Sequence, residues 1–302
     1  MQKLRSLISE HLSQIEDKEE SCRLFHGRGK KWSEYSHLSI DWYSPTVLIT
    51  SYRELSESEK RNLLEIISTI DNLPCENILL QKRYLRGETP EILKGELLGE
   101  AVAVENSEKY LLQLKNPQNI GFFLDMRIGR EWLRANGQNK KILNLFSYTC
   151  SLSVAALNGG AKEVINVDMS KSSLNIGEKN HLLNGFQSKA KFIPYDIMNS
   201  FGNLKKKGPY DLVLIDPPTN QGDSFKVERD YFKIIKKLSD MTNPQAQVMA
   251  CLNSPFLTSE FLLNAFKDHA PNFIFHEKIS SSFESMESNS EEGLKILIFN
   301  KI

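Results

Sequence analysis

Residues 141–146 read Lys-Ile-Leu-Asn-Leu-Phe, and residues 147–151 continue as Ser-Tyr-Thr-Cys-Ser. The apolar run predicts a buried strand, and a helical pattern begins at Ser153 after the polar turn. Gly159-Gly160 then ends the helix, and Glu163 to Val167 predicts a second strand. A strand, a helix and a second strand in this order are typical of a parallel βαβ unit.

The same alternation continues to the end of the chain. Further strands are predicted at Lys191 to Ile193, Asp211 to Ile215, Gln247 to Cys251, Phe273 to Ile279 and Leu294 to Phe299. Helical patterns lie between them at 172–183, 229–238 and 258–268. The last two strands have no helix between them, which predicts a closing hairpin with one antiparallel strand. The fold class is therefore α/β, with a doubly wound, seven-stranded Rossmann-like sheet over residues 118–302.

Residues 1–117 show a different pattern and predict a smaller amino-terminal α+β domain. Helical spacing runs over Leu4 to Glu20 and over Ser56 to Asn72, where Ser56 and Glu59 form a capping box. Strands are predicted at Leu38 to Tyr43, Pro45 to Ser51, Ile78 to Tyr84, Leu97 to Glu105 and Lys109 to Leu114, the last two as a hairpin across Asn106-Ser107.

The composition is that of an ordinary globular protein, with 302 residues, 38 basic against 38 acidic side chains and 40% hydrophobic residues. No run approaches the roughly 18 apolar residues of a membrane-spanning helix, and the start of the chain does not read as a secretory signal. We therefore expect a cytoplasmic protein without a membrane partner. Four cysteines (Cys22, Cys75, Cys150 and Cys251) form no close pair, so neither a disulfide framework nor a metal site is predicted.

Polar residues follow the first four predicted strands of the sheet. The turn 147–151 follows the first strand, and Asp168, Asp196 and Asp216 follow the next three. In doubly wound sheets the ligand binds at these carboxyl ends. An acid after the second strand can accept hydrogen bonds from ribose hydroxyls, and the next acid can accept from an adenine amino group. Asp216, with Pro217 and Pro218, makes a rigid turn that can orient a reacting nitrogen or carbon.

Two other interpretations compete with this nucleotide site. Asp168 could be a helix N-cap and Asp216 a turn residue, but three acids at matched strand ends favour a functional role. A nicotinamide-binding domain would also place an acid after the second strand. Such a domain requires Gly-x-Gly-x-x-Gly after the first strand, whereas residues 146–151 contain no glycine. The sequence therefore argues against hydride transfer.

These motifs resemble the class I S-adenosylmethionine-dependent methyltransferases. The resemblance lies in Asn144-Leu-Phe-Ser-Tyr-Thr-Cys-Ser-Leu-Ser153, Asn166-Val-Asp168 and Asp216-Pro-Pro218. More narrowly, the chain is similar to bacterial large-subunit ribosomal RNA methyltransferases of the cytosine-C5 type and their guanine-N7 relatives. Supporting segments, in the same order as in that family, are Cys22-Arg-Leu-Phe-His-Gly-Arg-Gly29, Gly121-Phe-Phe-Leu-Asp-Met-Arg127, Asn180-His-Leu-Leu-Asn-Gly185 and Val227-Glu-Arg-Asp230.

The resemblance implies S-adenosylmethionine as the cofactor and assigns residues to it. Asp168 would bind the ribose, Met169 would pack on the adenine, and Asp196 would meet its amino group. Asp216 would lie beside the methyl donor. The methionine end would be held by the turn of Phe146, Ser147, Tyr148, Thr149 and Cys150, and its polar groups by Asp125 and Arg127. The alternative for this last pair is an ordinary salt bridge between the domains.

Two positions depart from the resembled family. Its cofactor turn usually has a glycine where this chain has Cys150. Its cytosine enzymes carry a nucleophilic cysteine just past the fifth strand, because C5 methylation needs a thiolate to attack C6. This chain has Asn253 there, as in the guanine-N7 relatives, with Cys251 two residues earlier on the same strand face. Cys251 is either a nucleophile or a core thiol, so the catalytic candidates are Asp216, Pro217, Pro218, Asn253 and Cys251.

The resemblance implies that an RNA base, in ribosomal RNA, is the substrate, unpaired or flipped out of its helix. Two segments combine basic and aromatic residues in a way that suits RNA contact: Arg28, Lys30, Lys31 and Trp32 in the first, and Lys82, Arg83, Tyr84 and Arg86 in the second. A homodimer is also implied, because the relatives commonly form one. Two alternatives stay open. One is methylation of a protein or small molecule, since this fold accepts many substrates, and the other is a non-catalytic protein that binds the cofactor or RNA.

Overall fold

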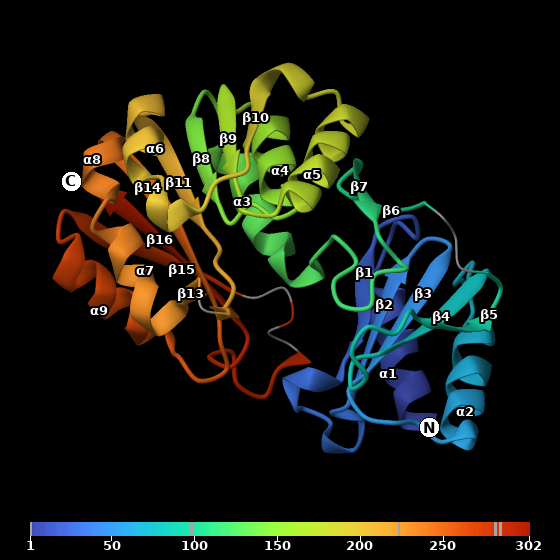
Figure 1. Cartoon of the computed structure of the whole chain (residues 1–302). Helices are drawn as coiled ribbons and strands as arrows, with labels where there is room; N and C mark the ends of the chain where they lie inside the picture. Colours follow the sequence, from blue (N-terminus) through green and yellow to red (C-terminus); the bar gives the residue numbers. More distant parts are fainter. Residues whose placement is uncertain (1, 97–99, 223, 281–282, 284–285) are drawn as a thin grey trace. The chain divides into compact units, whose positions relative to one another are not determined.

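A computed structural model describes the whole chain except residues 1, 97–99, 223, 281–282 and 284–285. The chain divides into two compact units (Figure 1). Unit 1 comprises residues 1–124 and 285–288, and unit 2 comprises residues 125–284 and 289–302. Over the described residues, no helix has both the length and the apolar character needed to cross a membrane.

Unit 2 is built on a seven-stranded sheet of order β10-β9-β8-β11-β14-β16-β15. The strands are β8 Lys141–Leu145, β9 Glu163–Val167, β10 Ala190–Ile193, β11 Tyr210–Ile215, β14 Thr242–Asn253, β15 Phe273–Ile279 and β16 Leu294–Lys301. The first five pair in parallel, and β16 is antiparallel to both of its neighbours. The predicted doubly wound sheet with one antiparallel strand is confirmed. Strand order reverses between β8 and β11, which is where such sheets bind ligands.

Helices cover both faces of this sheet because successive strand residues point to opposite sides. In β11, Leu212 and Leu214 face one core, while Val213 and Ile215 face the other. The first core is covered by α3 Arg127–Asn136 and α4 Ser151–Asn158, beside α5 Lys171–Leu183. The second is covered by α6 Phe201–Lys207, α7 Val227–Ile235, α8 Leu238–Met241 and α9 Ser259–His269 (Figure 1).

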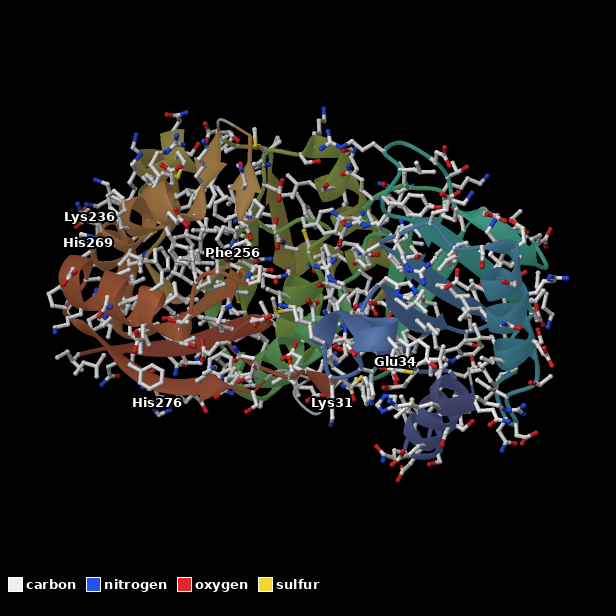
Figure 2. All side chains as sticks on the ribbon, turned by 90° about the horizontal axis from the view of Figure 1, so that it is seen from below. Lys31, Glu34, Lys236, Phe256, His269 and His276 are labelled. Atoms are coloured by element: carbon white, nitrogen blue, oxygen red, sulfur yellow. The ribbon has the colours of Figure 1, made fainter. Side chains whose placement is uncertain are left out.

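Aromatic contacts join α7 to α9 on the second face. The rings of Phe232 and His269 have centroids 5.2 Å apart, and the Lys236 Nζ lies 5.0 Å from the Phe232 ring centroid. Figure 2 labels Lys236 and His269 close together. Tyr231, one residue before Phe232, is fully buried, and its hydroxyl donates to the carbonyl oxygens of Ile215 and Cys251. Helix α7 is therefore fixed to the carboxyl ends of β11 and β14.

Unit 1 contains a five-stranded sheet of order β1-β2-β3-β4-β5. The strands are β1 Cys22–His26, β2 Leu38–Tyr43, β3 Thr46–Ser51, β4 Asn77–Lys82 and β5 Glu91–Lys94, with helices α1 Gln2–Ser13 and α2 Glu57–Ser68. The predicted hairpin is confirmed as β6 Ala101–Glu105 and β7 Glu108–Leu112, joined across Asn106-Ser107. Residues 97–99 of the strand predicted there lie outside the described residues. The helix predicted to reach Glu20 ends at Ser13.

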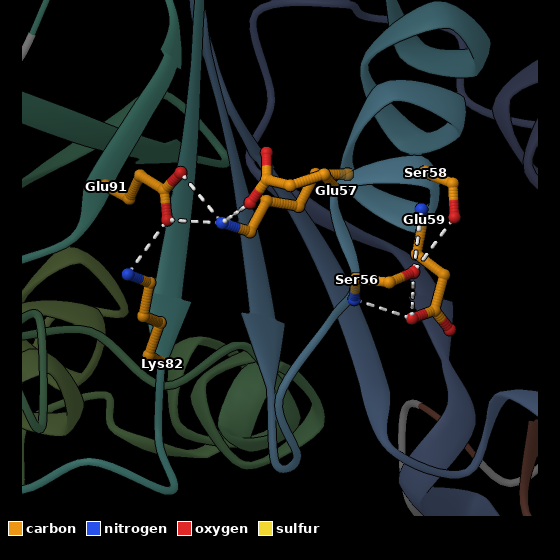
Figure 3. Close-up of polar contacts among 7 residues, drawn as sticks. Ser56, Glu57, Ser58, Glu59, Lys82 and Glu91 are labelled. Atoms are coloured by element: carbon orange, nitrogen blue, oxygen red, sulfur yellow. Dashed lines mark hydrogen bonds and ion pairs between the residues drawn. The ribbon is translucent and has the colours of Figure 1, made fainter.

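The predicted capping box at the start of α2 is confirmed. The Ser56 Oγ accepts from the Glu59 backbone N–H at 3.3 Å, and the Ser56 N–H donates to Glu59 Oε2 at 2.8 Å (Figure 3). Nearby, Lys60 and Lys82 both pair with the Glu91 carboxylate, at 3.2 and 2.9 Å. Lys82, one of the basic residues predicted to suit RNA contact, is thus engaged in an ion pair within unit 1.

Candidate active site

A pocket with about 300 Å³ of open space lies beyond the carboxyl ends of β8, β9 and β10. Its lining residues are Phe146, Asp168, Met169, Tyr195, Asp196, Ile197, Met198, Gln221, Ser224 and Phe225. Four of the predicted cofactor residues, Phe146, Asp168, Met169 and Asp196, are therefore brought together around one space. The described residues contain no group of three or more His, Cys, Asp or Glu side chains that could hold a metal ion.

Asp168 connects the turns that follow β8 and β9. Its Oδ2 accepts from the Tyr148 backbone N–H at 2.9 Å, and its Oδ1 accepts from the Ser170 backbone N–H at 2.8 Å. The N-cap of α5 is Ser170, whose hydroxyl accepts from the Ser173 N–H, so the N-cap interpretation of Asp168 is wrong. Each carboxylate oxygen keeps a second lone pair, which is available to ligand hydroxyl groups.

The turn after β8 has an uncommon backbone. Phe146, Tyr148 and Cys150 adopt left-handed φ angles of 56°, 46° and 63°. For residues with a Cβ, such conformations cost on the order of 1–3 kcal/mol each, and they cluster at ligand sites. Glycine has no such penalty. This explains why the resembled family usually has glycine at the position of Cys150.

The Cys150 side chain is accommodated by a glycine on α5. The thiol is fully buried, and a Cβ added at Gly177 would lie 2.5 Å from its sulfur. Burial raises the pKa of the Cys150 thiol far above its usual range, so the group is neutral. Cys150 therefore supports the turn by packing and offers no reactive thiolate.

This packing leads to a double-mutant prediction. Gly177→Ala is expected to lower the free energy of unfolding by about 1–3 kcal/mol, because the new methyl group overpacks against the Cys150 thiol. In a Cys150→Gly background most of that cost should disappear. Urea unfolding measures both effects. Gly202→Ala is the matched control, because nothing lies within 4 Å of a Cβ at that helical glycine. Equal costs in both backgrounds would contradict the packing argument.

A chain of buried hydrogen bonds lies behind the turn. Asn144 Nδ2 donates to Asn166 Oδ1 at 2.9 Å, and Asn166 Nδ2 donates to Ser153 Oγ at 3.1 Å. Ser153 Oγ lies 2.8 Å from His181 Nε2, and His181 Nδ1 lies 2.7 Å from the Gly177 carbonyl oxygen. Burial lowers the pKa of His181 to about 4, so the ring is neutral. Nδ1 therefore carries the proton, and Nε2 accepts from the serine hydroxyl.

Two further polar contacts concern the turn itself. Asn180 Nδ2 donates to the Thr149 carbonyl oxygen at 2.9 Å and so fixes the turn to α5. The Ser147 hydroxyl is buried beside the Cys150 thiol, a weak partner, and makes no other hydrogen bond with the described residues. A polar ligand group that reached Ser147 would satisfy this atom, which otherwise carries a cost for burial.

Asp216 follows β11 and has an unusually high pKa. No described residue donates a hydrogen bond to its carboxylate. Desolvation and the negative charge of Asp125 raise the pKa of Asp216 to about 7. Two carboxyl groups that disfavour each other's ionisation form a place where a positively charged ligand group is stabilised. This pair is therefore chemically suited to the cationic end of a ligand.

Arg127 lies in the first turn of α3, a helix that the sequence pattern does not predict. Its Nε donates to Glu131 Oε1 at 3.1 Å on the same helix, and Arg127 does not line the pocket. The segment is rich in charge, and its buried residues are Gly129, Arg130 and Leu133. Since only one of these is a large apolar residue, the usual helical spacing of apolar residues gave little signal.

Cys251 and Asn253 occupy different environments at the end of β14. Cys251 is buried in the core with residues of α3 and α4, and burial together with Asp216 and Asp125 raises the pKa of its thiol well above the usual range. A thiol that stays neutral is a poor nucleophile. Asn253 is exposed, and its carbonyl oxygen accepts from Thr219 Oγ1 at 2.6 Å. These observations support the interpretation of Cys251 as a core thiol.

Several pocket residues were not predicted. Phe225 belongs to a short hairpin of β12 Asn220–Gln221 and β13 Phe225–Lys226, and its ring lies 5.0 Å from that of Phe146. Ile197 and Met198 directly follow Asp196, whose Oδ1 accepts from the Met198 N–H at 2.9 Å. Their position directly after an acid at the end of a strand was the sequence signal that could have placed these two residues at the pocket. Nothing in the sequence placed Phe225 at the pocket.

A family model for S-adenosylmethionine-dependent methyltransferases matches residues 22–300. The chain is 32% identical over 229 residues to a protein named ribosomal RNA large subunit methyltransferase K/L from Psychromonas ingrahamii, covering 72% of this chain and 30% of the relative. The protein of the same name from Shewanella loihica is 33% identical over 230 residues, covering 72% and 32%. The chain thus spans about a third of the length of these curated relatives.

The fold also matches solved structures. The crystal structure of SMU.776 complexed with SAH superposes with a TM-score of 0.87 at 22% identity. The match covers 99% of this chain and 80% of that one. The fold of the chain is therefore one that is found among solved structures.

Proposed function

The chain belongs to the S-adenosylmethionine-dependent methyltransferase family, and on that premise we propose that it methylates a base of RNA, in ribosomal RNA. The predicted enzyme class and cofactor are confirmed by this membership. The observation that carries the proposal is the pocket at the strand ends, where Phe146, Asp168, Met169 and Asp196 converge. The names of the two curated relatives support ribosomal RNA as the substrate.

The residues of the pocket fit this cofactor. Asp168 would accept hydrogen bonds from the ribose hydroxyls. Met169, which is 48% exposed at the pocket, offers an apolar surface to the adenine. The buried hydroxyl of Ser147 would gain a partner at the methionine end. Asp216 and Asp125 would face the positive charges of the sulfonium and amino groups.

Methyl transfer requires mainly that the enzyme position the acceptor atom relative to the methyl donor. The cofactor, when bound, supplies an activated methyl group. The Asp216-Pro217-Pro218 turn fixes one wall of the site because both prolines restrict the backbone. The Asn253 amide can donate to and accept from the edge of a base. These residues would position the acceptor atom and limit the access of water, which are the main contributions that an enzyme makes to such a displacement.

The environment of Cys251 favours a nitrogen acceptor, since attack on cytosine C6 would need a thiolate. The test is methyl transfer from labelled S-adenosylmethionine to unmodified ribosomal RNA, followed by digestion to nucleosides and mass spectrometry. A labelled guanosine is expected. Labelled 5-methylcytidine would contradict the role of Asn253 and restore Cys251 as the nucleophile. Confirmed cofactor binding without any labelled nucleoside would favour a protein or small-molecule substrate, or a non-catalytic protein.

Cys251→Ala is therefore expected to leave the turnover number within about twofold of the unmodified protein. The same change should lower the free energy of unfolding by about 1 kcal/mol, because it removes a buried sulfur atom from the core. Steady-state methyl transfer and urea unfolding measure the two effects. Cys75→Ala, at the half-buried cysteine of unit 1, is a matched control for cysteine removal. A loss of turnover of several orders of magnitude would mean that Cys251 is the nucleophile.

We further propose that unit 1 contributes to RNA recognition. The Arg28 guanidinium carbon lies 4.2 Å from the Tyr52 ring centroid, and the Lys31 Nζ lies 5.5 Å from the ring of Trp32. Cations beside aromatic rings offer both phosphate contact and stacking surfaces. A cytoplasmic location follows from the proposed ribosomal RNA substrate. A homodimer is proposed from the family resemblance, and sedimentation of the full chain tests it.

A further inference from the structure

An exposed aromatic ring lies just beyond β14. Phe256, which is labelled in Figure 2, is 88% exposed. This is the highest value among the described large hydrophobic side chains. A single exposed apolar side chain needs no explanation by itself. The surroundings of Phe256, however, are built to hold it in one place.

Buried hydrogen bonds hold the turn that carries this ring. Ser254 is 1% exposed, and its carbonyl oxygen accepts from Lys295 Nζ at 2.6 Å. Lys295 is fully buried in β16, and its Nζ also donates to the Glu291 carbonyl oxygen at 2.8 Å. The Ser254 hydroxyl accepts from the Phe256 N–H at 3.3 Å, and Pro255 restricts the backbone between them. Lysine is almost never fully buried, so its use here indicates that the position of this turn matters.

The same turn lies beside the proposed catalytic turn. Strands β11 and β14 are parallel neighbours, and Ile215 pairs with Ala250. The segments 216–219 and 253–256 therefore leave the sheet at the same edge. The hydrogen bond from Thr219 Oγ1 to the Asn253 carbonyl oxygen, at 2.6 Å, joins them directly.

We infer that the target base stacks on the ring of Phe256 while the Asn253 amide contacts its edge. This inference rests on the proposed function, an RNA base as methyl acceptor. A base that leaves its helix loses its stacking neighbours, and an exposed aromatic ring replaces one of them for any base. Phe256 is thus a substrate-contact residue, and Lys295 is the positioning residue that holds its turn.

The test compares Phe256→Ala, Phe256→Trp and Phe275→Ala with the unmodified protein in methyl transfer to ribosomal RNA. Phe275 is a matched control, because its ring is 44% exposed on β15 and it lies outside the site. Phe256→Ala is expected to lower kcat/KM for RNA by about 10- to 100-fold, the range for loss of one base-stacking contact. Phe256→Trp keeps an aromatic surface and should recover most of the kcat/KM that Phe256→Ala loses. Affinity for S-adenosylmethionine should stay unchanged in all three variants, and the melting temperature should stay unchanged in the two Phe256 variants.

Equal activity of Phe256→Ala and the unmodified protein would overturn the inference and leave the proposed function intact. Weaker cofactor binding by Phe256→Ala would also overturn it, since the ring would then act on the fold or the cofactor. If the unmodified protein methylates no RNA, the proposed function fails and the inference fails with it.

Discussion

Asp168→Ala is expected to raise the Kd for S-adenosylmethionine by at least about 100-fold. The carboxylate is the proposed acceptor for two ribose hydroxyls, and hydrogen bonds to a charged group contribute about 1.5–3 kcal/mol each. The change also frees the backbone N–H groups of Tyr148 and Ser170, which the carboxylate now holds at 2.9 and 2.8 Å. Isothermal titration calorimetry on the full chain measures the affinity.

Asp211→Ala is the matched control for this experiment. Asp211 also accepts from a backbone N–H, that of Lys141 at 2.8 Å, and from Asn243 Nδ2 at 2.6 Å. It lies near the amino end of β11, at the edge of the sheet opposite the pocket. Asp211→Ala should lower the free energy of unfolding and leave the affinity for S-adenosylmethionine unchanged. Unchanged affinity in Asp168→Ala would mean that the pocket is misplaced, and equal loss in both variants would indicate a general effect on folding.

The fold of unit 2 could be predicted because its elements have strong local patterns. β9 and β15 are predicted with the bounds that the structure gives them, Glu163–Val167 and Phe273–Ile279. The site could be predicted in part for a geometric reason. Parallel strands end at a common edge, so residues 168 and 196 line one pocket although 28 positions separate them in the chain.

The missed features depend on tertiary contacts. Strands β1 and β5 are short, and their apolar and polar residues do not alternate regularly along the sequence. Helix α3 buries Arg130, a residue type that a hydrophobic pattern would place on the surface. The two-residue period correctly places Cys251 and Asn253 on one strand face. It does not give the point where β14 leaves the core. The sequence pattern therefore treats the Cys251 thiol, which is 1% exposed, and the exposed Asn253 amide as equal candidates for the catalytic residue. Only packing separates them.

The affinity for S-adenosylmethionine is expected to rise with pH through the range 6 to 8. Below a pKa of about 7 the Asp216 carboxyl group is neutral. Above it, the carboxylate attracts the positive charges of the cofactor, so binding releases a proton. With one such group, Kd should fall by about tenfold between pH 6 and pH 8 and then stay level.

Two neighbouring groups do not titrate in this range. Cys251 and Tyr231 both have a pKa raised well above the usual value, so both stay neutral. In the protein without cofactor, the free energy of unfolding changes with pH in the opposite direction to the cofactor affinity. The folded state holds the Asp216 proton up to about pH 7, whereas the unfolded chain releases it near its ordinary pKa of 3.8. The free energy of unfolding should therefore fall as pH rises from about 4 to 7.

Two variants test the assignment of this titration to Asp216. Asp216→Asn should bind the cofactor at least about tenfold more weakly than the unmodified protein at pH 8, with no dependence on pH, because the amide resembles the protonated carboxyl group. Asp125→Asn removes the charge that opposes ionisation, so the rise in affinity should move to lower pH. Calorimetry in two buffers of different ionisation enthalpy counts the protons released. A pH dependence that persists in Asp216→Asn would assign the titration to another group and remove the argument for a carboxylate beside the sulfonium.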